Sequence, residues 1–321
     1  MSETIRWGIL GAANFARKTM GPAIHAAHGA ELAALATSSA DKAAGFAAFA
    51  PGLRVHASYD ALLADPEIDA VYIPLPNHLH VEWCVRALAA GKPVLCEKPI
   101  AMAEGEFDQL IAARDAAGLM CAEAYMILHH PQWQRARALV SDGAIGEIVH
   151  VQSAFTFDLR DMSNIRNRPE TGGGGLRDIG VYTIGSARFA TGHEPTGWTA
   201  RIAWENDVDV AVEAAADLGP ARFTFRVGIR AERWQEVLFH GTTGLIRLPA
   251  PFNAGEFGEA ELHLIRPGRE TITEAWPVAA QYVNQVETFG ETVRNGTPYP
   301  VPLEWSRGTQ AAIDAIFAAA G

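Results

Sequence analysis

Cysteine is scarce in this 321-residue chain: Cys84, Cys96 and Cys121 are the only three, and no two of them have CxxC spacing. An odd, widely spaced set is not the pattern of a disulfide framework or of a zinc site. The tandem His78 and His80 has no partner cluster at metal-ligand spacing either, so we expect no metal. Each cysteine stands in an apolar run, where a reduced thiol packs well. We therefore expect buried, reduced thiols and a cytoplasmic protein.

Long apolar runs and positive charge are also lacking. No apolar run has the length of a membrane span, and the N-terminus MSETIRWGIL has neither the basic segment nor the small-residue cleavage site of a secretory signal. Lys and Arg total 26 against 37 Asp and Glu, which gives a net charge of -11. Such a charge disfavours binding to nucleic acid phosphates and to anionic membranes. The sequence therefore predicts neither as a partner.

What remains is a globular composition, 49% hydrophobic and 20% charged, on a chain longer than one core usually grows. Up to about residue 123, short apolar runs alternate with helical patterns, which is the rhythm of parallel strands joined by crossover helices. Further on, alternating runs such as DVDVAVEAAADL and ARFTFRVGI predict a mostly antiparallel sheet. We expect an α/β domain with a doubly wound parallel sheet over residues 1–124 and an α+β domain over residues 125–321.

The hydrophobic periodicity also places the individual elements. In the first domain, strands are expected at 5–10, 31–36, 70–73, 93–96 and 120–122, and helices at 15–27, 78–90 and 104–117. In the second domain, a helix at 131–141 precedes a long strand at 147–157. Closing helices are expected at 281–294 and 303–320, and they could pack against either domain.

The first expected strand runs directly into a tight turn of small residues and then into a helix. Gly11, Ala13 and Ala16 occupy positions of a G-x-G-x-x-G/A fingerprint, in which small side chains let the backbone approach a pyrophosphate at a helix N-terminus. The methyl group of Ala13 leaves less room than a glycine would, and many parallel-sheet proteins have such a turn without binding a dinucleotide. The residues expected to hold a dinucleotide are Gly11, Ala12, Ala13, Asn14 and Phe15.

The end of the second strand indicates which dinucleotide is preferred. An acidic residue there would bind the ribose hydroxyls of NAD, but the sequence has Thr37, Ser38 and Ser39, followed by Lys42. Hydroxyls and a lysine suit the 2'-phosphate of NADP, so NADP(H) is favoured over NAD(H) although no arginine stands there. A solvated turn is the alternative interpretation.

The segment GKPVLCEKPIAM places Glu97 and Lys98 directly after an apolar strand, at the sheet edge where open α/β folds bind ligands. A lysine in that position is otherwise most often a solvated surface residue. With WGILGAANFA, PLPNHLHVEWCVRALAAGKPVLCEKP, EAYMILHHPQ and GGGGLRDIGVY, the chain resembles the glucose-fructose oxidoreductase and inositol dehydrogenase (Gfo/Idh/MocA) family. It is most similar to the branch with NADP-dependent xylose dehydrogenases, anhydrofructose reductases and dimeric dihydrodiol dehydrogenases.

This resemblance implies a Rossmann domain, a second domain for substrate binding and oligomerisation, and hydride transfer between a nicotinamide cofactor and a sugar, polyol or related substrate. It implies that Lys98 lies beside the nicotinamide and the substrate and that Glu97 helps to hold the nicotinamide. It implies that the cofactor is bordered by Pro76, Asn77 and His80. It also implies a homodimer or homotetramer formed through the C-terminal sheet.

Asp178 and Tyr182 stand four residues apart in a helical pattern after four glycines, so their side chains share one face. Hydride transfer to a carbonyl needs a proton for the developing alkoxide, and Tyr182 is the expected acid/base group. The ordinary phenol pKa of about 10 is high for this task, but a nearby Lys98 would lower it and stabilise the alkoxide. Asp178 would orient the pair or bind a substrate hydroxyl. The structural alternatives are an ordinary half-buried tyrosine and a helix-end carboxylate.

Two positions depart from the family pattern and leave the substrate open. Leu128 stands where relatives often carry arginine, and Gly185 stands where they often carry Asn or Asp. A smaller or less polar substrate than an aldose is therefore an alternative. The expected pocket residues are Phe155, Phe157, Asn164 and Arg166. Two other functions also stay open: a redox-neutral elimination or glycoside cleavage with the same cofactor, and a nucleotide-binding sensor without catalysis.

Overall fold

The computed structural model describes residues 4–320, and the chain divides into two compact units. Unit 1 is built from the chain up to His129 and from Ala280–Ser306. Unit 2 is built from His130–Ala279 and from the chain from Arg307 onward. Helix α8 (Gln281–Asn295) therefore belongs to unit 1, although it follows all of the second sheet in the sequence.

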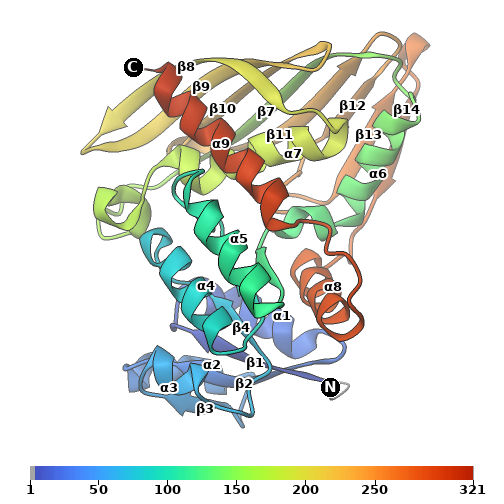
Figure 1. Ribbon diagram of the computed structural model, residues 1–321. Coiled ribbons are helices and arrows are strands. Elements are labelled where there is room, and N and C mark those ends of the chain that lie inside the picture. The colour runs from blue at the N-terminus through green and yellow to red at the C-terminus, as the bar shows by residue number, and fades with distance from the viewer. Residues whose placement is uncertain (1–3, 321) are drawn as a thin grey trace. The chain divides into compact units, whose positions relative to one another are not determined.

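Unit 1 contains a six-stranded parallel sheet with the order β3-β2-β1-β4-β5-β6 (Figure 1). Its strands are β1 (Ile5–Leu10), β2 (Ala30–Ala36), β3 (Arg54–His56), β4 (Ala70–Ile73), β5 (Val94–Cys96) and β6 (Cys121–Glu123). Its helices are α1 (Gly21–Ala26), α2 (Ala40–Ala47), α3 (Tyr59–Leu63), α4 (His80–Ala89) and α5 (Glu106–Ala117), besides α8. This strand order is that of the dinucleotide-binding doubly wound fold, which opens its ligand crevice at the carboxyl ends of the strands.

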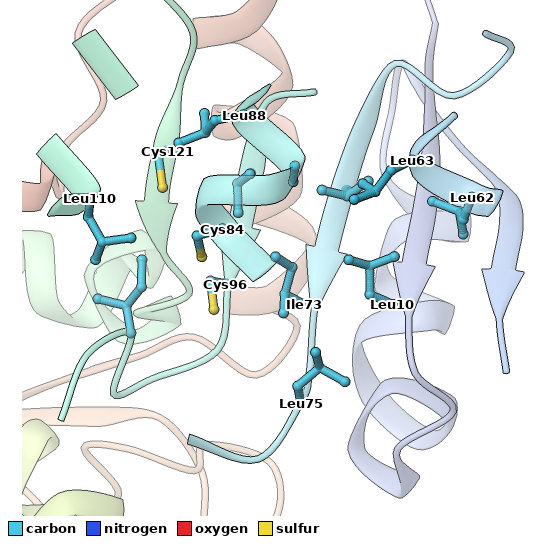
Figure 2. Packing of buried hydrophobic residues seen from close by; sticks show 14 of the residues in the cluster. Leu10, Leu62, Leu63, Ile73, Leu75, Cys84, Leu88, Cys96, Leu110 and Cys121 are labelled. Carbon is cyan, nitrogen blue, oxygen red and sulfur yellow. The ribbon is translucent and has the colours of Figure 1, made fainter. Parts of the chain in front are cut away.

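Helices pack on both faces of this sheet, so its central strands are apolar throughout. Every residue of β4 and β5 is buried. On one face, Cys84 of α4, Cys96 of β5 and Cys121 of β6 pack in a single cluster of buried residues (Figure 2). All three are free thiols, as predicted, and burial raises the pKa of Cys84 and Cys96. These thiols therefore remain protonated and act as small apolar side chains.

The other face of the sheet explains why α8 belongs to unit 1. Trp7 of β1 packs against Phe289 of α8, with 4.9 Å between the ring centroids. Both side chains are fully buried in a second cluster that also contains Val286. A helix far away in the sequence thus completes the core of the nucleotide-binding fold by burying its apolar stripe in this cluster.

Unit 2 contains an eight-stranded sheet with the order β14-β13-β12-β11-β7-β10-β9-β8 (Figure 1). The strands are β7 (Ile148–Asp158), β8 (Pro195–Glu205), β9 (Val208–Leu218), β10 (Ala221–Gly228), β11 (Arg230–Gly241), β12 (Leu245–Leu248), β13 (Glu261–Ile265) and β14 (Thr271–Ala275). β7 and β10 are parallel, and all other neighbours are antiparallel. The predicted fold class, a doubly wound parallel sheet followed by a mostly antiparallel one, is confirmed.

Helices α6 (Pro131–Ser141) and α7 (Val181–Thr191) pack against one face of this second sheet. The two faces of this sheet differ in exposure along β10: Phe223 and Phe225 on one face are buried, whereas Arg222 and Arg226 on the opposite face are exposed. Helix α9 (Leu303–Ala319) begins in unit 1 and continues in unit 2. α7 is preceded by a π-helical turn, Leu176–Gly180, which follows the glycine cluster of the sequence.

Candidate active site

The small-residue turn after β1 has the geometry that phosphate binding requires. Gly11 has a φ of 104°, a backbone conformation that L side chains rarely adopt, and a Cβ there would lie 2.9 Å from Leu75 Cδ2. The Gly11 N–H donates to the Ala36 carbonyl at 3.0 Å, which ties the turn to β2. Asn14 and Phe15 are exposed, and the Phe15 ring lies edge-on to Tyr282 with 5.7 Å between centroids. The turn thus presents exposed residues of the fingerprint at the carboxyl edge.

The hydroxyl residues after β2 are partly engaged in local structure. The Ser39 hydroxyl caps α2 by accepting the Lys42 N–H at 3.3 Å, and the Thr37 hydroxyl accepts the Ser39 N–H at 3.2 Å. Ser38 and Lys42 are exposed. Thr37 and Ser39 are therefore turn and cap residues first, and their hydroxyl hydrogens stay available to an anion.

A cavity of about 410 Å³ lies between this segment and the turn after β1. The turn residues Ala12, Ala13 and Asn14 and the first turn of α2 line it. Arg17 lines it as well, although the sequence analysis did not single it out. The shape, the small turn residues and the surrounding cations fit a phosphorylated nucleotide, so these residues are the ones that would hold a dinucleotide cofactor.

Glu97 anchors the segment that carries Lys98. The Tyr72 hydroxyl donates to Glu97 Oε1 at 2.6 Å, and the Lys98 N–H donates to Oε2 at 3.3 Å. Burial raises the pKa of Glu97, and burial beside Glu97 raises the pKa of Tyr72 well above its ordinary value. Lys98 follows this clamp and is itself half-buried. The two hydrogen bonds fix the backbone from which the Lys98 side chain emerges.

His80 joins two loops of the carboxyl edge. Its Nε2 lies 2.7 Å from the Leu75 carbonyl oxygen and its Nδ1 lies 2.8 Å from the Pro99 carbonyl oxygen. The ring is fully buried, and this burial lowers its pKa. Both nitrogens are thus occupied by the protein, and His80 connects the loop before Pro76 and Asn77 with the loop that carries Lys98.

Glu123 is a second carboxylate of this edge, is buried, and was not identified from the sequence. Its Oε1 accepts the Ile100 N–H at 3.0 Å, and burial raises its pKa. It stands at the end of β6, next to β5 in the sheet. The loop after β5 is therefore fixed from both sides, by Glu97 and by Glu123. A glutamate that ends an apolar strand is the signal that could have revealed it.

In unit 2, Asp178 lies within the π-helical turn Leu176–Gly180 and forms an ion pair. The Arg166 Nε–H donates to Asp178 Oδ2 at 2.6 Å, and the Asp178 side chain is 12% exposed. The Asn164 side-chain oxygen accepts the Arg166 N–H at 3.1 Å and thereby shapes the short helical turn that presents the arginine. Asn164, Arg166 and Asp178, three residues predicted from the sequence, are thus brought together. A π-helical turn is a frequent feature of functional sites.

Tyr182 lies one turn further on, at the start of α7, in an aromatic cluster. Its ring centroid is 5.8 Å from that of Phe155 and 5.7 Å from that of Phe252. Phe157 lies edge-on to Phe155, with 6.2 Å between the ring centroids. Gly185, further along α7, is buried. The structure therefore brings the predicted pocket residues Phe155 and Phe157 together with Tyr182.

Asp209 fixes the glycine cluster that precedes Asp178 and Tyr182 in the chain. It was not identified from the sequence. Its Oδ2 accepts the Leu176 N–H at 2.5 Å, and burial raises its pKa to about 7. Gly174 has a φ of 114°, and a Cβ there would lie 1.9 Å from Asp209 Oδ1. The cluster needs glycine at this position because a buried carboxylate occupies the space of a side chain.

The described residues contain neither clustered metal ligands nor long apolar helices. Within residues 4–320, no three His, Cys, Asp or Glu side chains are placed to share a metal ion. In the same residues, no helix combines the length and the apolar character that crossing a bilayer requires. His130 is buried and His129 is partly buried, and loss of solvation lowers the pKa of each to about 4. The His129 ring is held by Thr288 and Tyr299, with Nδ1 3.3 Å from the Thr288 hydroxyl and Nε2 3.2 Å from the Tyr299 hydroxyl.

Comparisons with known proteins agree with this architecture. Residues 5–125 match the oxidoreductase family with an NAD-binding Rossmann fold, and residues 133–247 match the GFO/IDH/MocA C-terminal domain. A D-xylose 1-dehydrogenase (NADP(+)) of Haloferax volcanii is 33% identical over 98% of this chain and 97% of its own length. The chain belongs to the GFO/IDH/MocA oxidoreductase family. The family, the fold class and the general activity, that of an NAD(P)-dependent oxidoreductase, are thus predicted correctly.

Two other relatives also match over nearly the whole chain. An uncharacterised oxidoreductase of Rhizobium meliloti is 39% identical, covering 98% of this chain and 96% of its own. The 3-ketoreductase KijD10 of Actinomadura kijaniata, solved with NADP and TDP-benzene, has a TM-score of 0.90 and 31% identity over 98% of both chains. Variants of that enzyme with a tyrosine replaced by phenylalanine and with a lysine replaced by alanine are also solved with both ligands.

Proposed function

We propose that this chain is an NADP(H)-dependent oxidoreductase that transfers a hydride between the nicotinamide and a hydroxyl or carbonyl carbon of a sugar or related polyol. The observation that carries the proposal is the clamp on Glu97, which fixes Lys98 at the same sheet edge as the phosphate turn. Dehydrogenases and reductases of sugars among the relatives support it. Sugar nucleotides and free sugars are both substrates of such relatives, and both belong to the proposed class.

In this proposal the cofactor, when bound, supplies or accepts the hydride, and the protein handles the proton and the charge. Tyr182 exchanges a proton with the substrate oxygen. Lys98 stabilises negative charge on that oxygen. Asp178, held by Arg166, orients a substrate hydroxyl. The aromatic side chains around Tyr182 supply the apolar wall against which a sugar ring packs.

The proposed preference for NADP(H) rests on the end of β2. No carboxylate stands at residues 37–39 to bind a free ribose 2'-hydroxyl, and Lys42 supplies a cation nearby. The remaining turn residues, together with Pro76 and Asn77, would line the cofactor. We further propose that the protein is cytoplasmic, which agrees with three buried thiols that form no disulfide.

We also propose a homodimer or homotetramer formed through the second sheet. On the sheet face opposite the buried phenylalanines of β10, residues of neighbouring strands are paired side by side: Thr224 with Gln152, and Gln152 with Leu238. A broad, twisted sheet face of mixed polarity is a suitable surface for a two-fold interface. Light scattering at micromolar concentration should give two or four times the mass of the chain, and a monomer would contradict this part.

The test of the proposed function is turnover with a panel of aldoses, polyols, keto-sugars and their nucleotide-linked forms, followed by NADPH absorbance. We expect at least one substrate, and a loss of kcat of roughly 100- to 10,000-fold in both Lys98→Ala and Tyr182→Phe. The matched control is Lys18→Ala, which removes an exposed ammonium from the same unit and should leave kcat unchanged. Full turnover in Lys98→Ala would reject the mechanism.

Two outcomes of the same panel would point to the alternatives. Product that accumulates while bound cofactor is not consumed would indicate a redox-neutral elimination or glycoside cleavage. Nucleotide binding with silence across the whole panel would indicate a sensor. The presence of both a clamped Lys98 and Tyr182 favours the oxidoreductase over the sensor.

A further inference from the structure

Two cations line the cavity between the phosphate turn and α2. Arg17 lies in the π-helical turn Ala16–Met20, which leads into α1, and Lys42 lies in the first turn of α2. Within the described residues, neither side chain is held in an ion pair, whereas Arg6 and Arg54 of the same unit pair with carboxylates. On a chain with a net charge of -11, two uncommitted cations in one cavity predict an anionic ligand there.

The path of the Arg17 side chain shows which part of a dinucleotide it faces. The Arg17 N–H donates to the Ala13 carbonyl at 3.0 Å, so the residue stands one helical turn beyond the phosphate turn. Its stem runs across Gly45 of α2, where an added Cβ would lie only 2.6 Å from Arg17 Cδ. The stem of the side chain therefore lies against α2, at the side of the cavity opposite the phosphate turn that Ala12 and Ala13 form. Gly45 provides the room for this course.

The adenosine ribose of a dinucleotide in this fold lies between the first turn and the end of β2, which is the position of this cavity. We infer that Arg17, together with Lys42, binds the 2'-phosphate of NADP(H) and sets the nucleotide preference; this inference rests on the proposed function. A guanidinium suits a phosphate because its N–H groups form two parallel hydrogen bonds with it. The arginine absent from the end of β2 is thus supplied by the first helix.

Among the described residues, Asp41 is the one carboxylate that lines the same cavity. It opposes a bound anion, but the two cations outnumber it, and the N–H groups at the start of α2 add positive potential. The Ser39 hydroxyl, which accepts the Lys42 N–H, can donate its own hydrogen to the phosphate. The balance of charge around the cavity therefore favours the 2'-phosphate over a neutral ribose.

The test is calorimetric measurement of Kd for four ligands: NADP+, NAD+, 2',5'-ADP and 5'-AMP. Arg17→Ala is expected to weaken NADP+ and 2',5'-ADP roughly 100-fold, since two charge-assisted hydrogen bonds are lost. The Kd values for NAD+ and 5'-AMP should change by less than about twofold, because these two ligands lack the 2'-phosphate. Lys18→Ala, which removes the neighbouring exposed cation outside the cavity, should change none of the four.

Two more variants separate a local loss from a folding defect. Arg17→Lys keeps a charge but not the paired N–H groups, so it should recover part of the affinity for 2',5'-ADP. Gly45→Ala keeps both cations but displaces the arginine stem, so it should weaken 2',5'-ADP and leave 5'-AMP unchanged. The unfolding temperature without nucleotide should match that of the wild type in Arg17→Lys.

The outcomes distinguish this inference from the proposed function. Equal losses for NADP+ and NAD+ in Arg17→Ala would assign the arginine to the pyrophosphate and overturn the inference. An unchanged preference for NADP+ in that variant would also overturn it, with the proposed cofactor intact. A wild type that binds NAD+ as tightly as NADP+ would overturn the proposed cofactor and this inference together.

Discussion

The clamp on the Lys98 segment can be tested by removing one oxygen atom. Tyr72→Phe deletes the hydroxyl that donates to Glu97 Oε1 at 2.6 Å and leaves the ring in place. The lost bond is a short one to a partly buried carboxylate, so we expect a loss of about 1.5–3 kcal/mol in the free energy of unfolding near neutral pH. Because Lys98 then emerges from a looser loop, kcat should also fall.

This loss of stability should depend on pH in a defined direction. Burial raises the folded-state pKa of Glu97 above 4.5, so its contribution to stability is complete at low pH and is lost as the pH rises through that pKa. Removing the donor raises this pKa further and enlarges the loss. Urea denaturation should therefore separate Tyr72→Phe from the wild type more at pH 8 than at pH 5.

Tyr59→Phe is the matched control for this experiment. Tyr59 belongs to the same unit, and burial raises its pKa, but its ring packs on Trp83 and its hydroxyl has no carboxylate partner among the described residues. Its effect on unfolding should be small and equal at both pH values. An equal effect of the two substitutions, or a Tyr72→Phe loss that does not vary with pH, would refute the clamp.

Two further predictions concern buried ionisable groups of unit 2. Burial raises the pKa of Asp209 from 3.8 to about 7, so the free energy of unfolding should fall by up to roughly 4 kcal/mol as the pH rises from the lower to the higher value. Asp209→Asn should abolish this pH dependence in urea titrations. An unchanged pH profile in that variant would contradict the prediction. Burial lowers the pKa of His130 from 6.5 to about 4, so stability should be lost as the pH falls through that window. His130→Asn keeps an acceptor for the Gln132 N–H and should reduce this acid loss in thermal melts; an equal loss would disprove it.

The elements that the sequence predicts well are those with long buried faces. β1 and β4 have the predicted bounds, because strands buried on both sides of a parallel sheet are continuous apolar runs between polar ends. The helix Pro131–Ser141 also has its predicted bounds, since proline favours the first helical turn.

In unit 1, the elements that were not predicted are short and half-exposed. β3 has three residues on the edge of the sheet, and α2 and α3 have few buried side chains. Their apolar pattern is too brief to establish a period, and they form because Ser39 and Ser58 cap the two helices and the rest of the sheet is already in place.

The site shows the same division between local and tertiary information. Lys98, Asp178 and Tyr182 stand in motifs with fixed spacing, so the sequence alone marks them as candidates, and their roles stay predictions. Arg17 and Asp209 are not marked in this way, because α2 and the glycine cluster approach them only in the folded chain. For Ser39, the alternative interpretation as a solvated turn residue is partly right, because its hydroxyl caps α2.

The most direct test of the central claim follows the hydride itself. The protein is incubated with NADPH that carries deuterium at the transferred position of nicotinamide C4 and with the substrate that the panel identifies in its carbonyl form. We predict that mass spectrometry finds one deuterium on the reduced carbon of the product and an equal amount of NADP+. A product without deuterium, formed while the cofactor remains reduced, would contradict the account.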